Sequence, residues 1–112
     1  MDRKTFFLAL GLGSATFFLP TFASAETHLA EAISHLNEAI DRGKQGHADE
    51  LVTHAEAALK HAESAAVENN DLHTKIGIEY IKQAIQIGMA GHVGIATKQA
   101  EEGLNHLEES AK

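Results

Sequence analysis

An internal duplication constrains the fold of this chain more than any other feature. Residues 28–66 align with residues 73–111 at a constant offset of 45 with no gap, and thirteen aligned positions are identical. The identical pairs include His28/His73, Ile33/Ile78, Ala39/Ala84, Ile40/Ile85, Gly43/Gly88, Gly46/Gly91, His47/His92, Leu59/Leu104 and His61/His106. We therefore expect one structural unit that occurs twice.

Within each unit, apolar residues recur at helical spacing. In the first unit they are Leu29, Ile33, Leu36 and Ile40, followed by Leu51, Ala55, Ala58/Leu59 and Ala62; in the second they are Ile78, Ile81 and Ile85, followed by Val93, Ala96, Ala100, Leu104 and Leu107. Alanine, glutamate and lysine, all good helix formers, fill much of the remainder. The pattern predicts an all-α fold, an antiparallel four-helix bundle of two tandem αα-hairpins with helices of about 16 to 20 residues.

Glycine turns interrupt the two units at matched places. The segments Gly43-Lys44-Gln45-Gly46 and Gly88-Met89-Ala90-Gly91 predict tight turns, with the first glycine of each suited to a left-handed helix end. A polar stretch, residues 68–71, joins the units, and Asn70 or Asp71 is suited to cap the next helix. Since the core stripe is rich in alanine, we expect modest stability.

The N-terminus has the pattern of a secretory signal peptide. Charged Asp2-Arg3-Lys4 precedes an apolar run from Phe6 to Phe18, and the segment ends in Ala23-Ser24-Ala25. We expect cleavage between Ala25 and Glu26, export to the periplasm, and a mature domain of residues 26–112 with repeat units at about 28–66 and 73–111. A membrane anchor is the alternative, but the apolar run is short and contains Gly11, Gly13 and Pro20.

The charge and the absence of cysteine narrow the function. Loss of one acidic and two basic residues with the signal peptide changes the formal charge from −7 to −8. Such acidity disfavours nucleic acid and favours cations as partners, and no apolar stretch that could span a membrane remains after cleavage. Without cysteine, disulfides, thiolate zinc sites, iron–sulfur clusters and covalent c-type haem are excluded. Any metal must bind to histidine and carboxylate.

All eight histidines lie in the expected mature chain, and their spacing is informative. His28 and His35 are seven residues apart, as are His47, His54 and His61, so each series follows one edge of its helix. Seven residues rise about 10.5 Å, too far for one metal ion to bind two successive members. Ligands must therefore come from neighbouring helices or from carboxylates.

Register in the expected hairpins pairs several histidines at equal height. In the first hairpin, residues whose numbers sum to about 89 face each other, which pairs His28 with His61 and His35 with His54. In the second, the sum is about 179 and pairs His73 with His106, while Tyr80 and Gln99 occupy the positions of the other pair. Since helix axes lie about 8–10 Å apart, two such imidazoles can reach one ion, whose nitrogen ligands lie about 2 Å away.

Carboxylates at helical neighbour spacing supply further candidate ligands: Glu31, Glu38, Glu50, Glu102 and Glu109. His47 and His92 each follow a glycine turn and fit a ligand or a helix-start role equally well, whereas Tyr80 and Met89 are expected to be packing residues. Two histidines with one or two carboxylates or waters suit copper(II), nickel and zinc, with copper(II) favoured by the general affinity order. Because binding requires neutral imidazole, occupancy should fall as pH drops through about 6.5.

The segment Gly91-His92-Val93-Gly94-Ile95-Ala96-Thr97-Lys98, continuing through Ala100-Glu101-Glu102 to His106-Leu107, resembles the periplasmic small metal-binding proteins. The likeness spans the mature region and includes the duplicated Gly-x-x-Gly-His turns. It implies a monomeric four-helix bundle that binds several divalent metals, notably copper, for storage, buffering or detoxification. Tyr80 and Gln99 are a departure, because members of this family are richer in histidine.

Two other classes of function compete with this hypothesis. A di-iron carboxylate enzyme needs Glu-x-x-His on two helices, and this chain has no such motif. A non-covalent haem bundle is disfavoured because the alanine-rich stripe of this chain offers few large residues to line a porphyrin pocket. The sequence also contains no recognisable hydrolase motif. We therefore expect no enzyme activity. The alternative that stays open is a periplasmic helical interaction or stress protein whose histidines are incidental products of the duplication.

Overall fold

The computed structural model describes residues 24–112, so the predicted signal peptide lies almost entirely outside the described part of the chain. Four helices make up this part: α2 (Ala25–Lys44), α3 (Ala48–Asn69), α4 (Leu72–Met89) and α5 (Val93–Ser110). They contain 20, 22, 18 and 18 residues, close to the predicted lengths, and residues 24–112 form no strand. The all-α prediction is confirmed. None of these helices combines the length and apolar character needed to cross a membrane.

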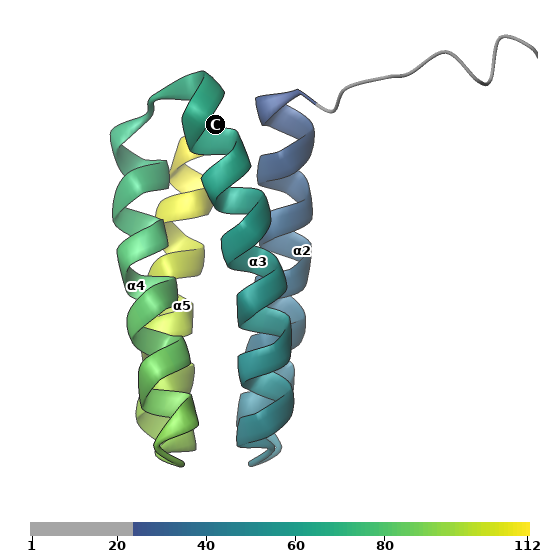
Figure 1. Cartoon of the computed structure of the whole chain (residues 1–112), viewed down its shortest axis with the longest axis vertical. Helices are drawn as coiled ribbons and strands as arrows, with labels where there is room; N and C mark the ends of the chain where they lie inside the picture. The colour runs from purple at the N-terminus through teal and green to yellow at the C-terminus, as the bar shows by residue number, and fades with distance from the viewer. Residues whose placement is uncertain (1–23) are drawn as a thin grey trace, which may run out of the picture.

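The helices form two antiparallel hairpins that lie side by side, α2 with α3 and α4 with α5 (Figure 1). Each helix packs against two neighbours, because α3 also contacts α4 and α2 also contacts α5, while α3 and α5 make only slight contact. Both hairpin turns lie at one end of the bundle, and the link from α3 to α4 lies at the other (Figure 1). The predicted antiparallel bundle of tandem hairpins is confirmed.

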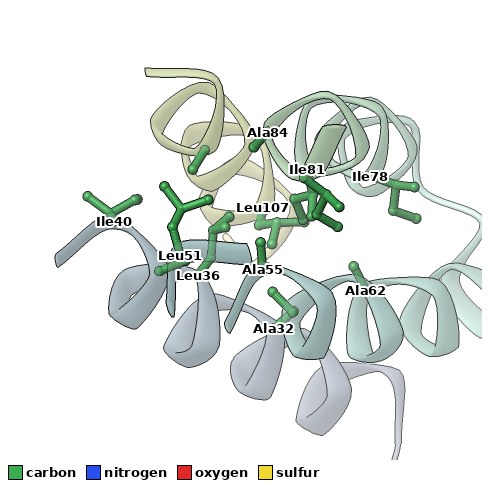
Figure 2. Close-up of a cluster of buried hydrophobic side chains, with 14 of the residues drawn as sticks. Ala32, Leu36, Ile40, Leu51, Ala55, Ala62, Ile78, Ile81, Ala84 and Leu107 are labelled. Carbon is green, nitrogen blue, oxygen red and sulfur yellow. The ribbon is translucent and has the colours of Figure 1, made fainter. Parts of the chain in front are cut away.

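The core consists of the apolar stripes that the sequence predicts. Figure 2 shows side chains from the two hairpins directed toward one another, with Leu36, Leu51, Ile81 and Leu107 fully buried among them. Nine of the seventeen buried hydrophobic residues are alanine, so the helices approach closely but each buried residue removes little apolar area from water. Modest stability therefore stays the expectation for this core.

The glycines have roles that differ from the prediction for the turns. Left-handed backbone occurs at Gly46 and Gly91, with φ of 86° and 88°, and not at the first glycine of either turn. Gly43 stays helical and buried, because a Cβ atom there would overlap Thr97 Oγ1 of α5 and lie 2.6 Å from a Leu51 methyl group. The prediction for the first glycines was wrong, since close helix packing, and not helix termination, requires Gly43.

Side-chain caps start two of the helices. Asp71 accepts hydrogen bonds from the backbone N–H groups of His73 and Thr74 at 2.8 and 3.3 Å, as predicted for the link between the units. Ser24 caps α2, because its Oγ accepts from the Thr27 N–H at 3.2 Å and its carbonyl accepts from the His28 N–H at 2.9 Å. Each hairpin thus begins at a residue whose side chain satisfies free N–H groups of the first helical turn.

We expect Gly43→Ala to destabilise the bundle by about 1–3 kcal/mol, because the added methyl group must displace side chains of α3 and α5. Gly94→Ala is the matched control, since Gly94 is helical and exposed and a Cβ atom there meets nothing within 4 Å. That variant should be neutral or more stable by up to about 1 kcal/mol. Chemical denaturation of both variants measures the difference, and equal stability would contradict the packing role of Gly43.

Candidate metal centre

Two histidine pairs lie across the hairpins at the positions that the register predicts. His28 Nδ1 lies 3.1 Å from His61 Nδ1 between α2 and α3, and His73 Nδ1 lies 3.2 Å from His106 Nδ1 between α4 and α5. Two nitrogens bound about 2.0–2.1 Å from one ion are separated by about 2.8–3.4 Å for bond angles between 90° and 109°. Both pairs are therefore already spaced for one shared ion.

A third aromatic ring extends each pair along its hairpin. His35 stacks on His61, with ring centroids 5.5 Å apart and planes 7° apart, and Tyr80 stacks on His106 at 5.7 Å and 11°. We name the set His28, Glu31, His35 and His61 the first seam, and the set His73, Tyr80 and His106 the second seam. The duplication has preserved the arrangement of rings while changing the chemistry of one of them.

The first seam holds the strongest candidate ligand group. Within residues 24–112, one group of at least three potential metal ligands has its ligand atoms all within 4.8 Å of one another, and it consists of Glu31, His35 and His61. A Glu31 carboxylate oxygen lies 3.9 Å from His35 Nε2 one turn along α2. With His28 beside His61, three imidazoles and one carboxylate gather in this seam.

The structure places His35 next to His61. His54, which the register pairs with His35, lies outside the ligand group of the first seam. The physical reason is that side chains on a helix lean toward its N-terminus. On antiparallel helices His35 leans toward the height of His28, and His61 leans from that height toward His35, so the two rings converge. His54 also points toward the N-terminus of α3, which carries its ring away from the height toward which His35 points, and it is half-buried there.

Two predicted acidic ligands lie next to a guanidinium group. Arg42 of α2 lies 3.8 Å from a carboxylate oxygen of Glu38 and 3.4 Å from one of Glu50, which joins the two helices near their turn. All three side chains remain well exposed, so each ion pair contributes little stability. A metal ion that binds Glu38 or Glu50 must therefore compete with the Arg42 guanidinium. The sequence signal for the Glu38–Arg42 ion pair is the spacing of four residues along one helix.

The second seam has fewer ligands. Lys112 donates a hydrogen bond of 3.0 Å to Glu109 and holds the pKa of that carboxyl below its usual value, with a smaller contribution from His73 and His106. Glu109 is therefore ionised near this histidine pair, while Glu102 is exposed on α5. Ile76 and Tyr80 stand where the first seam has Glu31 and His35. The second seam thus lacks the compact group of the first.

The remaining candidates lie at the helix ends. His47 and His92 occupy the N-cap positions of α3 and α5, are exposed, and make no capping hydrogen bond through their side chains. His47 lines a shallow hollow together with Asp49 and Glu50. Met89, predicted to pack, is 65% exposed because it is the last residue of α4, so that prediction was wrong.

Comparison with known proteins gives one finding. The sequence model of the small metal-binding protein family matches residues 3–110, nearly the whole chain. No curated protein sequence matches.

The difference between the seams can be tested by restoring the missing ligands. We expect Ile76→Glu combined with Tyr80→His to raise the copper stoichiometry by about one ion, because the second seam then carries the ligand set of the first. Ile76→Glu combined with Gln99→His is the control, since it places the histidine at the register partner. Elemental analysis after gel filtration measures the copper bound by each variant. Equal gains for both variants would contradict the claim that the site depends on the convergence of these side chains.

Proposed function

Because the chain belongs to the small metal-binding protein family, we propose that it binds divalent transition metals at the first seam, with copper(II) preferred and nickel and zinc also accepted. The observation that carries this proposal is the cluster of Glu31, His35 and His61. Imidazole nitrogens with a carboxylate oxygen suit all three metals, and the general affinity order places copper(II) first. We propose binding, and not catalysis, as the function.

The exposure of the first seam favours a role in buffering, storage or detoxification. The side chains of His35 and Glu31 are 35% and 53% exposed, so an ion can reach them from solvent and water can complete its coordination. Nothing in the fold has to open for the ion to enter or leave. An acidic chain also raises the local concentration of cations around such a site.

We also propose that the protein acts in the periplasm as a monomer. The support for the periplasm is the sequence of residues 1–25, whose charged start, apolar centre and Ala23-Ser24-Ala25 end have the form of a cleavable signal peptide. The support for the monomer is the resemblance to the small metal-binding proteins. Fractionation of cells that express the full chain, with mass determination of the exported product, tests this. Recovery of uncleaved protein in the cytoplasm would oppose it.

Metal binding by the first seam should depend on its own histidines and not on the histidine content of the chain. We expect His35→Ala combined with His61→Ala to weaken copper binding at the seam at least about tenfold, or about 1.4 kcal/mol, because the central ligand group is lost. His47→Ala combined with His92→Ala removes the same number of histidines at the helix ends and should leave that affinity within about twofold. Isothermal titration of a form that begins at Ser24, and so keeps the N-cap of α2, measures both.

The outcome of that titration also separates the two functional classes. If the two double variants lose affinity equally, the seam is not the site. If the unaltered protein takes up no more copper or nickel than a helical bundle poor in histidine, the interaction or stress protein hypothesis replaces this one.

Bound metal should also stabilise the small core. At a free copper concentration about 100 times Kd, we expect the free energy of unfolding to rise by about 2.7 kcal/mol, because the ligand binds only the folded arrangement of α2 and α3. Thermal melts with and without copper measure the effect, and a chelator should reverse it. The His35→Ala, His61→Ala variant should lose most of the increase; an equal increase in that variant would show that stabilisation comes from elsewhere.

A further inference from the structure

We propose that removal of the leader after Ala25 creates a second, chemically distinct metal site at the new N-terminus, selective for copper(II) and nickel(II). Its four ligands are the terminal amine of Glu26, the backbone nitrogens of Thr27 and His28, and the Nδ1 atom of His28. The site rests on the cleavage proposed above, and it shares His28 with the first seam.

The sequence Glu26-Thr27-His28 supplies this donor set because histidine stands third from the new terminus. A free amine, two successive amide nitrogens and the imidazole of the third residue close consecutive chelate rings around one ion in a plane. Copper(II) and nickel(II) favour such square-planar nitrogen coordination, whereas zinc favours a tetrahedron. Binding releases both amide protons, and the two resulting negative charges cancel the charge of the ion.

The hydrogen bonds at the start of α2 show that cleavage frees the required amides. The Thr27 N–H donates to Ser24 Oγ at 3.2 Å, and the His28 N–H donates to the Ser24 carbonyl at 2.9 Å. Cleavage after Ala25 removes Ser24 and therefore both acceptors. Because the first N–H groups of a helix have no partner within it, these amides are then available to a metal.

The first residues of the mature chain can also leave the helix without disturbing the core. Glu26 and Thr27 are exposed and His28 is half-buried, whereas Leu29, at 4% exposure, is the first buried residue of α2. The core contacts of α2 therefore begin after the proposed site. Residues 26–28 can therefore leave the helix and arrange their nitrogens in one plane around an ion, while the helix from Leu29 onward keeps its position.

His28 is the residue that links the new site to the first seam. The Nδ1 atom required at the terminus is the atom that lies 3.1 Å from His61 Nδ1. The compact seam group contains Glu31, His35 and His61 but not His28, so the seam keeps its three ligands when His28 turns to the terminus. One ion can then occupy each site.

The duplication does not repeat this site. His73 is the counterpart of His28, but it follows Asp71-Leu72 within the chain, where no free amine exists. We therefore infer one terminal site per molecule. The site occurs once because proteolytic processing creates one free amine, whereas the bundle contains the hairpin twice.

Two forms of the protein test the proposal, one beginning at Glu26 and one beginning at Ser24. The longer form keeps both seams and the Ser24 cap, but its His28 is fifth in the chain. With nickel(II) chloride, we expect the shorter form to give a yellow, diamagnetic complex of one equivalent, and with copper(II) chloride a visible band at the short wavelength of a four-nitrogen plane. The longer form should give neither signature. The same signatures in both forms would overturn the proposal.

Two substitutions in the shorter form separate the terminal site from the seam. Thr27→Pro removes one required amide proton, and proline is tolerated in the first turn of a helix, so the diamagnetic nickel signal should disappear while seam binding persists. His61→Ala should weaken seam binding and keep the nickel signal. Loss of the nickel signal in His61→Ala but not in Thr27→Pro would assign that signal to the seam and overturn the proposal.

The exported protein itself provides the last measurement. Mass spectrometry of the mature protein should give Glu26 as its first residue with an unmodified amine. Any other N-terminal residue or an acylated amine would overturn the proposal for the cell, whatever the seams bind.

Discussion

The close approach of helices across an interior of alanine and glycine is the constraint on which the rest of the structure depends. Small buried residues such as Ala32, Ala55 and Ala62 let the axes come near enough for imidazoles on the outer edges of two helices to meet. Gly43 has the same function where α2, α3 and α5 converge. A larger side chain at Gly43 would have to displace Leu51 of α3 and Thr97 of α5.

The duplication gives two similar scaffolds with different capacities for metal. Both hairpins bring a histidine pair to within about 3.2 Å and stack a third ring on it, so the backbone arrangement survives the divergence of the two copies. The first copy has glutamate and histidine at two positions where the second has isoleucine and tyrosine. The candidate metal ligands therefore differ between the seams although the arrangement of their rings is the same.

The candidate sites differ in how firmly the fold holds their ligands. The seam ligands lie on two packed helices, so their positions follow from the core, and their exposure allows an ion to exchange. The terminal ligands belong to residues whose helical hydrogen bonds depend on Ser24, and they become available only when that residue is removed. An exported chain of this kind would carry one site built by packing and another built by processing.

The sequence by itself determined the four helices, the duplicated hairpin, a cap at Asn70 or Asp71 and the pairs His28–His61 and His73–His106. Helical periodicity and the short turns set both the face and the height of each residue. Those two quantities located these two pairs, but they failed for His35 and His54, which the same register places level with each other. Only the tertiary structure decided that His35 meets His61, that Arg42 of α2 also reaches Glu50 of α3, and that Gly43 serves packing. These outcomes depend on the lean of side chains along antiparallel helices and on competition among neighbours from different helices, and the spacing of residues along one chain contains neither.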